Sequence, residues 1–323
     1  MTRFTILVLI TVSVLISFKT AQAKTTSAQK AVLVTGASSG LGRAMTEMMA
    51  SRGYFVYAGA RKDKDIAELN AIENVQAVRL DVTEQEEIDA AVKTITNAGR
   101  GLYGLVNNAG VVVLGPLIET DEDDFNFQMD VNVYGPYRVT RAFAPLIIES
   151  RGRISIISSI SGTLAGSTWG PYSMSKHAME AFGDSLADEM EQFGVEVSLI
   201  EPGTYQSKIG DNAVQRMEQR NQTIEDSQYK AEMEESVDWV TTHISQSGDP
   251  NEVAEAVMQA LFDKNPKPRY LVVPNQQQAE WTISRAMERL VEQNHQQKYS
   301  YDRAALIEML DKAMARQAGE ASP

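Results

Sequence analysis

The stretch from Lys30 to Gly42, KAVLVTGASSGLG, decides the fold of this chain. Its first six residues are a short apolar run typical of a buried strand, and helix-forming sequence follows from 43 to 52. The glycines at 36, 40 and 42 let the backbone turn tightly and approach a ligand closely. Because a helix starts at this turn, its free amide groups and its dipole favour a phosphate group. We therefore predict a strand–turn–helix unit with an anion-binding turn.

Strand and helix patterns alternate along most of the remaining chain. Further strands are predicted at 54–60, 75–80, 102–106, 154–158, 195–200 and 269–273, and helices at 121–148, 172–193 and 251–262. Thr83 with Glu86 three residues later predicts a capping box at the start of another helix. Strands that alternate with helices of this length form parallel sheets that are covered on both faces. We therefore expect an α/β fold with a doubly wound parallel sheet.

The alternation stops after the sixth strand. Residues 204–247 are rich in Gln, Glu, Met and Asn and have little strand character, so we expect a helical lid there. Residues 276–323 are expected to form a helical extension. The length of the chain fits a single catalytic domain over residues 24–275 that contains the lid and precedes this extension.

The first 23 residues form a separate segment. Arg3 precedes an apolar run from 4 to 18, and Ala21-Gln22-Ala23 closes it, which is typical of a secretory signal peptide. The run is shorter than the roughly 20 residues of a transmembrane helix. A retained signal anchor is the alternative, and Lys19 and Lys24 would then keep the catalytic domain on the cytoplasmic side. Localisation therefore stays open between export and attachment to a membrane.

Composition excludes several classes of function. The net charge of −13 argues against a nucleic-acid-binding surface. The chain has no cysteine, which excludes disulfides, thiolate metal sites and a cysteine nucleophile. The three histidines, at 177, 243 and 295, are too far apart for a histidine-rich metal site, so we expect no metal.

Tyr172 and Lys176 are spaced to lie one turn apart on the same face of a helix. A phenol with a pKa of about 10 is a poor acid or base at neutral pH. A nearby ammonium lowers that pKa, and the pair can then exchange protons with an alcohol or a carbonyl oxygen. The same spacing is common on solvated helix faces, so the function rests on the motifs around it.

The end of the second predicted strand indicates which dinucleotide binds. An acidic residue at this point binds the ribose 2′-hydroxyl of NAD, whereas an arginine accommodates the 2′-phosphate of NADP. The chain has Ala60 and then Arg61, and no acid before Asp63. Arg61 therefore predicts NADP, and NAD remains the alternative because Ser39 adds no second positive charge.

Together these motifs resemble the short-chain dehydrogenase/reductase family. Within it, the run from Tyr172 to Leu186, followed by Phe193-Gly194-Val195 and Glu201-Pro202-Gly203, resembles the branch that acts on retinol, steroids and similar alcohols. The resemblance covers residues 30–207. Its motifs occur in the family's order: Gly36, Gly40, Gly42, Asp81, Asn107-Asn108-Ala109-Gly110, Asn132, Ser159, Tyr172, Lys176 and Pro202-Gly203. The resemblance implies a Rossmann-type sheet and an NADP-dependent oxidoreductase that interconverts an alcohol and its ketone or aldehyde.

The resemblance also implies a role for each matched residue. Tyr172 would exchange the proton with the substrate oxygen, and Ser159 would hydrogen-bond that oxygen. Lys176 would lower the pKa of Tyr172 and hold the nicotinamide ribose, and Asn132 would position a water that relays protons to Lys176. The cofactor would contact Gly36, Ser38, Ser39, Gly40, Leu41, Gly42, Arg61, Asp81, Val82, Asn108, Ala109, Gly110, Tyr172, Lys176, Pro202, Gly203 and Ser207.

The sequence and its resemblance also predict the class of substrate and the assembly, and they leave two other functions open. Apolar residues before Tyr172 and in the lid predict a lipophilic small-molecule substrate: Leu164, Trp169, Tyr205, Ile209 and Met217. The resemblance implies a homodimer or homotetramer formed through the helices at 121–148 and 172–193. Two alternatives remain open, namely a non-catalytic NADP-binding sensor or scaffold and a nucleotide-sugar epimerase, which shares the Tyr–Lys spacing.

Overall fold

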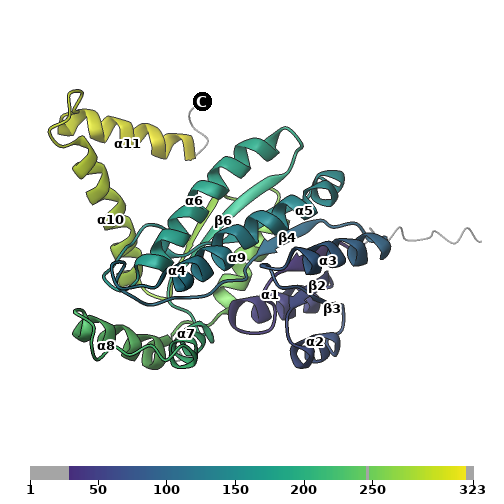
Figure 1. The fold of residues 1–323 in the computed structure, drawn as a ribbon. Helices are drawn as coiled ribbons and strands as arrows, with labels where there is room; N and C mark the ends of the chain where they lie inside the picture. Colours follow the sequence, from purple (N-terminus) through teal and green to yellow (C-terminus); the bar gives the residue numbers. More distant parts are fainter. Residues whose placement is uncertain (1–28, 245–246, 318–323) are drawn as a thin grey trace, which may run out of the picture.

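A seven-stranded parallel sheet forms the centre of the molecule (Figure 1). The computed structural model describes residues 29–244 and 247–317. The strands are β1 Ala31–Val34, β2 Phe55–Ala60, β3 Val75–Arg79, β4 Gly104–Asn107, β5 Arg153–Ile157, β6 Glu196–Pro202 and β7 Arg269–Val272. Their order, β3-β2-β1-β4-β5-β6-β7, shows that the chain winds outward from β1 in both directions. The predicted doubly wound α/β fold is confirmed.

Helices cover both faces of the sheet, because its strands are buried on both sides. One face packs against α3 (Gln85–Asn97), α5 (Gly135–Ser150) and α6 (Gly170–Glu191). The other face packs against α1 (Gly40–Ser51), α2 (Asp63–Asn70) and α9 (Asn251–Phe262). This two-faced burial leaves the carboxyl ends of the strands as the open edge of the domain, where ligands bind in open α/β sheets.

The helix predicted at 121–148 is interrupted by a different helical turn. It consists of α4 (Glu122–Met129), a π-helical segment (Asp130–Tyr134) and α5. Asn132 lies in the π-helical segment and is 2% exposed. Such segments are rare and occur frequently at functional sites, because the inserted residue shifts the side chains around it.

The predicted capping box at Thr83 and Glu86 is wrong. Helix α3 begins two residues after Thr83, at Gln85. The amide and the hydroxyl of Thr83 both donate to Oδ1 of Asp81, at 3.0 and 2.8 Å. Local hydrogen bonds from an Asp side chain to the residue two positions later compete with helix formation, and here they keep Thr83 in the turn after β3.

The lid and the C-terminal extension are both helical, as predicted. The described lid residues form α7 (Ile209–Gln219), α8 (Lys230–Asp238) and a π-helical segment (Trp239–His243). The extension forms α10 (Gln276–Asn294) and α11 (Arg303–Gln317), which project from the body as an arm (Figure 1). No helix in the described ranges has both the length and the hydropathy to cross a bilayer. The predicted signal segment lies outside the described residues.

The turn between β1 and α1 leaves no room for a side chain at Gly42. A Cβ atom there would overlap the carbonyl oxygen of Gly36 and lie 2.6 Å from Nδ2 of Asn108. We expect Gly42→Ala to lower the free energy of unfolding by about 2 kcal/mol, since overpacked sites lose about 1–3 kcal/mol. Urea unfolding measures the change. The control is Gly166→Ala, because a Cβ at Gly166 meets nothing within 4 Å; equal effects of the two variants would contradict the prediction.

Candidate active site

The glycine turn adopts a backbone that only glycine takes easily. Gly36 and Gly40 have φ values of +66° and +51°, in the left-handed region. Ser39 precedes the first residue of α1, and its side chain makes no capping hydrogen bond. The first amide groups of α1 and the Ser39 hydroxyl therefore remain available to an anion at this point. The free amide groups suit the pyrophosphate of a dinucleotide. Side chains at Gly36, Gly40 and Gly42 would collide with Ala109, Ser207 and the Gly36 carbonyl, so the turn keeps this shape only with glycine.

Asn108 ties this turn to the neighbouring strand. Its Nδ2 donates to the carbonyl oxygens of Thr35 and Gly36, at 2.8 and 3.2 Å. In return, the hydroxyl of Thr35 accepts the backbone amides of Asn108 and Ala109, at 2.9 and 3.0 Å. The ends of β1 and β4 are thus held together where the winding direction of the sheet changes. The predicted contact of Asn108 with the adenosine ribose stays a prediction.

A charged pair lies at the far end of the cavity. The Arg61 guanidinium lies 3.3 Å from a carboxylate oxygen of Asp81. Burial by itself would raise the pKa of Asp81, but hydrogen bonds from Thr83 and the charge and hydrogen bond of Arg61 outweigh it, so the pKa falls below its usual value. Asp81 is therefore an anion at neutral pH that orients Arg61 at the end of β2.

Tyr172 and Lys176 lie one turn apart on α6, as predicted; Lys176 is buried and Tyr172 is partly buried. Lys176 is 7% exposed, and its Nζ donates to the carbonyl oxygen of Ile157 at 2.9 Å. The ammonium lies 5.7 Å from the centroid of the Tyr172 ring. The hydroxyl of Ser159 accepts the amide of Ser161 at 3.0 Å, and its side chain also hydrogen-bonds Tyr172. Three of the four predicted catalytic residues are thus adjacent.

Burial governs the protonation of both groups. It raises the pKa of Tyr172, and the hydrogen bond with Ser159 offsets only part of that rise. The net shift of the Tyr172 pKa is therefore upward rather than downward as predicted, because loss of solvation is the larger effect. The predicted contribution of Lys176 stays a prediction. Burial also lowers the pKa of Lys176 to about 8, against the charge of Glu180. Lys176 can therefore lose its proton near neutral pH.

The side chain of Asn132 hydrogen-bonds the backbone after β4 and does not line the cavity. Its Oδ1 accepts the amide of Val111 at 2.8 Å, and its Nδ2 donates to the carbonyl oxygen of Val111 and to Oγ of Ser175, at 3.0 and 3.1 Å. The side chain thus fixes the segment after β4 against α6. These contacts occupy the carboxamide of Asn132, and the predicted proton relay through this residue stays a prediction.

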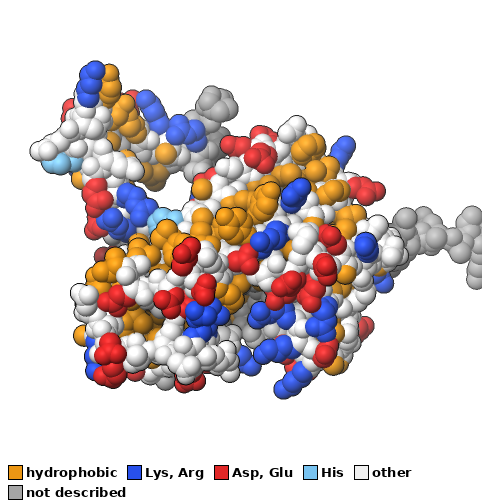
Figure 2. Space-filling view, viewed as in Figure 1, with side chains coloured by type: hydrophobic (Ala, Val, Ile, Leu, Met, Phe, Trp, Pro, Cys, Tyr) orange, Lys and Arg blue, Asp and Glu red, His pale blue; other side chains and the backbone are white. Residues whose placement is uncertain are grey.

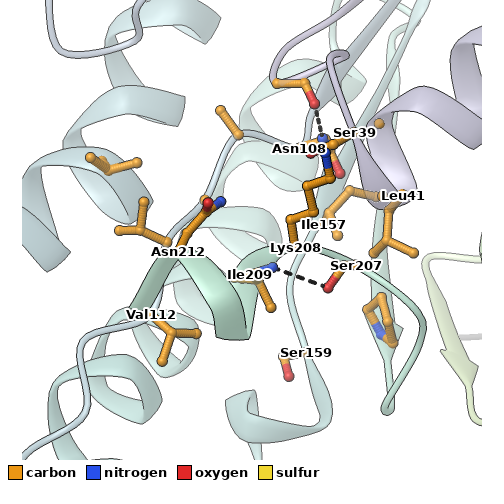
Figure 3. Close-up of a pocket in the computed structure, with 18 of the residues that line it drawn as sticks. Ser39, Leu41, Asn108, Val112, Ile157, Ser159, Ser207, Lys208, Ile209 and Asn212 are labelled. Carbon is orange, nitrogen blue, oxygen red and sulfur yellow. Dashed lines mark hydrogen bonds between the residues drawn. The ribbon is translucent and has the colours of Figure 1, made fainter. Parts of the chain in front are cut away.

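One cavity joins the nucleotide end to the catalytic end, and residues from distant segments meet around it (Figure 3). Every predicted site residue except Asn132 lines it. These are Gly36, Ser38, Ser39, Gly40, Leu41, Gly42, Arg61, Asp81, Val82, Asn108, Ala109, Gly110, Ser159, Tyr172, Lys176, Pro202, Gly203 and Ser207. Figure 3 shows Ser207 and Lys208, at the start of the lid, on the same cavity as Ser39 and Asn108.

The catalytic end of the cavity has apolar walls. Of the predicted substrate residues, Trp169, Tyr205 and Ile209 line it, whereas Leu164 and Met217 do not. The lining residues that the sequence analysis missed include Val112, Lys208, Asn212, Trp239, Val240 and Ile244. The rings of Trp169 and Trp239 meet edge to face at 5.4 Å. All of these except Val112 lie in the lid, whose sequence carries no motif.

The pKa of Lys176 makes stability depend on pH. The folded value of about 8 lies below the ordinary 10.5, so the unfolded chain holds more protons between these values and stability rises with pH across this window. Below pH 8 Lys176 is mostly protonated in both the folded and the unfolded chain, so the folded protein bears the full cost of burying this charge. From pH 7.5 to 9.5, this linkage stabilises the wild type by about 2 kcal/mol relative to Lys176→Met. Urea unfolding at both pH values tests this; Lys93→Met, at an exposed site, should keep the wild-type rise.

Comparisons with known proteins agree with this site. A family model described as short chain dehydrogenase matches residues 30–218. The mitochondrial D-beta-hydroxybutyrate dehydrogenase of Bos taurus is 34% identical over 261 residues, 75% of this chain and 76% of that protein. Retinol dehydrogenase 5 of Mus musculus is 37% identical over 183 residues, 55% of this chain and 57% of that protein.

A solved structure shares the fold. It is a short-chain dehydrogenase/reductase from Burkholderia phymatum in complex with NAD, with a TM-score of 0.70 and 23% identity; the match covers 84% of this chain and 98% of that one. The glycine turn, the Tyr172–Lys176 pair and the family match together show that this chain belongs to the short-chain dehydrogenase family, as an NAD(P)-dependent oxidoreductase that acts on CH–OH groups.

Proposed function

We propose that this protein is an NADP-dependent oxidoreductase that interconverts a lipophilic alcohol and its ketone or aldehyde. The observation that carries this proposal is the single cavity that runs from Arg61, past the glycine turn, to Tyr172. A dinucleotide bound along it would place its nicotinamide beside Tyr172, with Gly203 and Pro202 on the wall. The residues present fit that cofactor at both its pyrophosphate and its ribose ends.

The residues at the catalytic end can handle the proton. When bound, the cofactor supplies or accepts the hydride. The Tyr172 hydroxyl donates its proton to the carbonyl oxygen during reduction, which leaves a phenolate; during oxidation the phenolate form of Tyr172, after its own proton has left, takes the proton of the alcohol. The Ser159 hydroxyl already hydrogen-bonds Tyr172 and so lies where it can bond the same substrate oxygen. Lys176, buried with a pKa of about 8, can pass on a proton that Tyr172 has taken.

The preference for NADP rests on Arg61. The residue before it, Ala60, is 3% exposed and ends β2, so no carboxylate is available there for a ribose 2′-hydroxyl. The Arg61 side chain is 59% exposed and lines the cavity, where its guanidinium can reach a 2′-phosphate. Guanidinium groups bind phosphate oxygens with two parallel hydrogen bonds.

The preference for a lipophilic substrate rests on the walls beside Tyr172. Trp169, Trp239 and Val240 belong to or pack against one apolar cluster under the lid. Among the described residues that line the cavity, Arg61, Lys176 and Lys208 are the positively charged ones. Arg61 lies at the far end, so a substrate carboxylate, as in hydroxybutyrate, would depend on Lys208. The apolar walls favour a substrate of the retinol type instead.

A carbonyl and alcohol screen with NADP(H) and NAD(H) in parallel tests the reaction. We expect the wild type to turn over a lipophilic carbonyl, and Tyr172→Phe to lower kcat at least 100-fold while NADPH binding changes little, because general acid–base catalysis contributes about 10²–10⁴-fold. Binding of NADPH without turnover of any compound would favour a sensor or scaffold. Turnover of a nucleotide sugar with tightly bound NAD would favour an epimerase.

Arg61 provides a separate test of cofactor preference. We expect Arg61→Ala to weaken NADPH binding about 10- to 100-fold and to leave NADH binding within about threefold, since hydrogen bonds to charged groups contribute about 1.5–3 kcal/mol. Fluorescence titration with each nucleotide measures both affinities. Lys64→Ala is the matched control, because Lys64 is a cation on α2 that is 84% exposed and outside the cavity. Equal losses for NADPH and NADH would contradict a phosphate contact.

We further propose a homo-oligomer formed through α5 and α6. Large apolar side chains remain exposed on these helices and beside them, namely Tyr134, Tyr137, Met174 and Phe193. Apolar side chains gather over the same helices in Figure 2. Attachment to a membrane or export through residues 1–23 is likewise a proposal, which N-terminal sequencing of the native protein tests.

A further inference from the structure

A buried carboxylate at the start of α4 binds the lid. Asp124 is 1% exposed. Its Oδ1 accepts Nη2 and Nε of Arg216, at 2.7 and 3.1 Å, and its Oδ2 accepts Nε of Arg220 at 3.1 Å. Oδ2 also accepts the side-chain amide of Gln222. Three side chains from the end of α7 thus converge on one carboxylate that lies more than ninety residues earlier in the chain.

The contacts with Asp124 are strong, but the two arginines that make them remain partly exposed to solvent. Hydrogen bonds between guanidinium and carboxylate are among the strongest in proteins. The Arg216 guanidinium also lies 3.7 Å from the centroid of the Phe127 ring. However, the side chains of Arg216 and Arg220 are 27% and 33% exposed, so water can solvate both cations once the carboxylate no longer holds them.

The two ends of α7 contact different parts of the molecule. Its first residues, Ile209 and Gly210, line the cavity, and the residues that reach Asp124 lie at its end and just beyond. A helix of 11 residues is about 16 Å long and moves as a rigid rod. The helix thus connects the contacts with Asp124 to the wall of the cavity.

The same helix face also holds the opposite wall of the cavity. Gln128, four residues after Asp124, is 0% exposed; its Oε1 accepts the amide of Val113 at 2.7 Å and its Nε2 donates to the carbonyl oxygen of Val111 at 3.0 Å. Asn132, four residues further on, bonds Val111 as well. Polar side chains spaced along one face of α4 and the π-helical segment thus fix the wall after β4 and the lid to a single support.

We propose that Asp124 is a positioning residue that holds the lid closed over the substrate end of the cavity through Arg216 and Arg220. This inference rests on the proposed reaction only for its kinetic effect. Breaking the contact lets α7 lift, which weakens substrate capture and speeds product release, while the nucleotide end, built from the β1–α1 and β4 turns, keeps its geometry. Asp124 itself touches neither the cofactor nor the reacting atoms.

Kinetics of Asp124→Asn test the proposal. We expect KM for a bulky lipophilic substrate to rise about tenfold or more, with the NADPH affinity within twofold of the wild type. The matched control is Asp123→Asn: Asp123 is 84% exposed, shares the first turn of α4 and meets Arg220 only at 3.8 Å. Asp123→Asn removes the same charge from the first turn of α4, and thus changes the interaction with the helix dipole equally, but leaves the buried contacts of Asp124 intact. Its KM should therefore stay at the wild-type value.

Limited trypsin digestion gives a readout that needs no substrate. Trypsin cleaves after arginine, and the wild type presents Arg216 and Arg220 bound to Asp124. We expect cleavage after these two residues to be at least fivefold faster in Asp124→Asn than in Asp123→Asn. If no carbonyl is reduced by any variant, the proposed reaction fails, whereas this digestion still decides whether Asp124 holds the lid.

A second variant covers the case in which Asp124→Asn does not fold. Arg220→Gln removes one lid contact and leaves Arg216 to neutralise the buried carboxylate, so the core keeps its charge balance. We expect it to accelerate cleavage after Arg216 and to raise KM about threefold. Values of KM and cleavage rates that match those of Asp123→Asn, in folded Asp124→Asn or in Arg220→Gln, would overturn the proposal.

Discussion

The junction between β1 and β4 is the constraint on which the rest of the structure depends. The sheet winds in opposite directions from these two neighbours, so their loops separate and leave a crevice at the carboxyl edge. The Thr35 hydroxyl and the Asn108 amide bond the two loops to each other across the crevice. These bonds hold the glycine turn in place, and Gly42 allows the close packing that they require. A single cavity whose lining extends from Arg61 to Tyr172 then follows.

Burial of charge organises the catalytic end in the same way. Lys176 and Asp124 are both buried, but their hydrogen-bond partners differ in charge. Lys176 has a backbone carbonyl as its hydrogen-bond acceptor and a distant carboxylate, so burial lowers its pKa to about 8. Asp124 is met by two guanidinium groups. A buried charge without a close counter-ion becomes able to exchange its proton, whereas one with paired counter-ions joins two elements of structure.

The helical stretch formed by α4 and the π-helical segment connects these features. Asn132 fixes the wall after β4 and reaches Ser175 on the catalytic helix, and Asp124 holds the lid. The catalytic helix and the lid are thus both held by hydrogen bonds to α4 and the π-helical segment.

The sequence by itself determined the alternation of strands and helices, the glycine turn and the Tyr172–Lys176 spacing, because each is a pattern among residues that are close along the chain. Strand and helix periods are local, and so is the one-turn spacing on α6. Even the error at Thr83 was local, since an Asp side chain competed with the helix for its amide. The order of motifs then identified residues along the whole cavity, from Arg61 through the glycine turn to Tyr172 and Lys176.

Only the tertiary structure decided what lies around Tyr172 and how its proton is held. The direction of its pKa depends on burial, which follows from packing by Trp169, Trp239 and the lid rather than from the neighbouring Lys176. The bond from Asp124 to Arg216 joins residues that are 92 positions apart, and no spacing rule announces it. Solvation and long-range charge pairing are properties of the assembled fold, so a pattern along the chain cannot specify them.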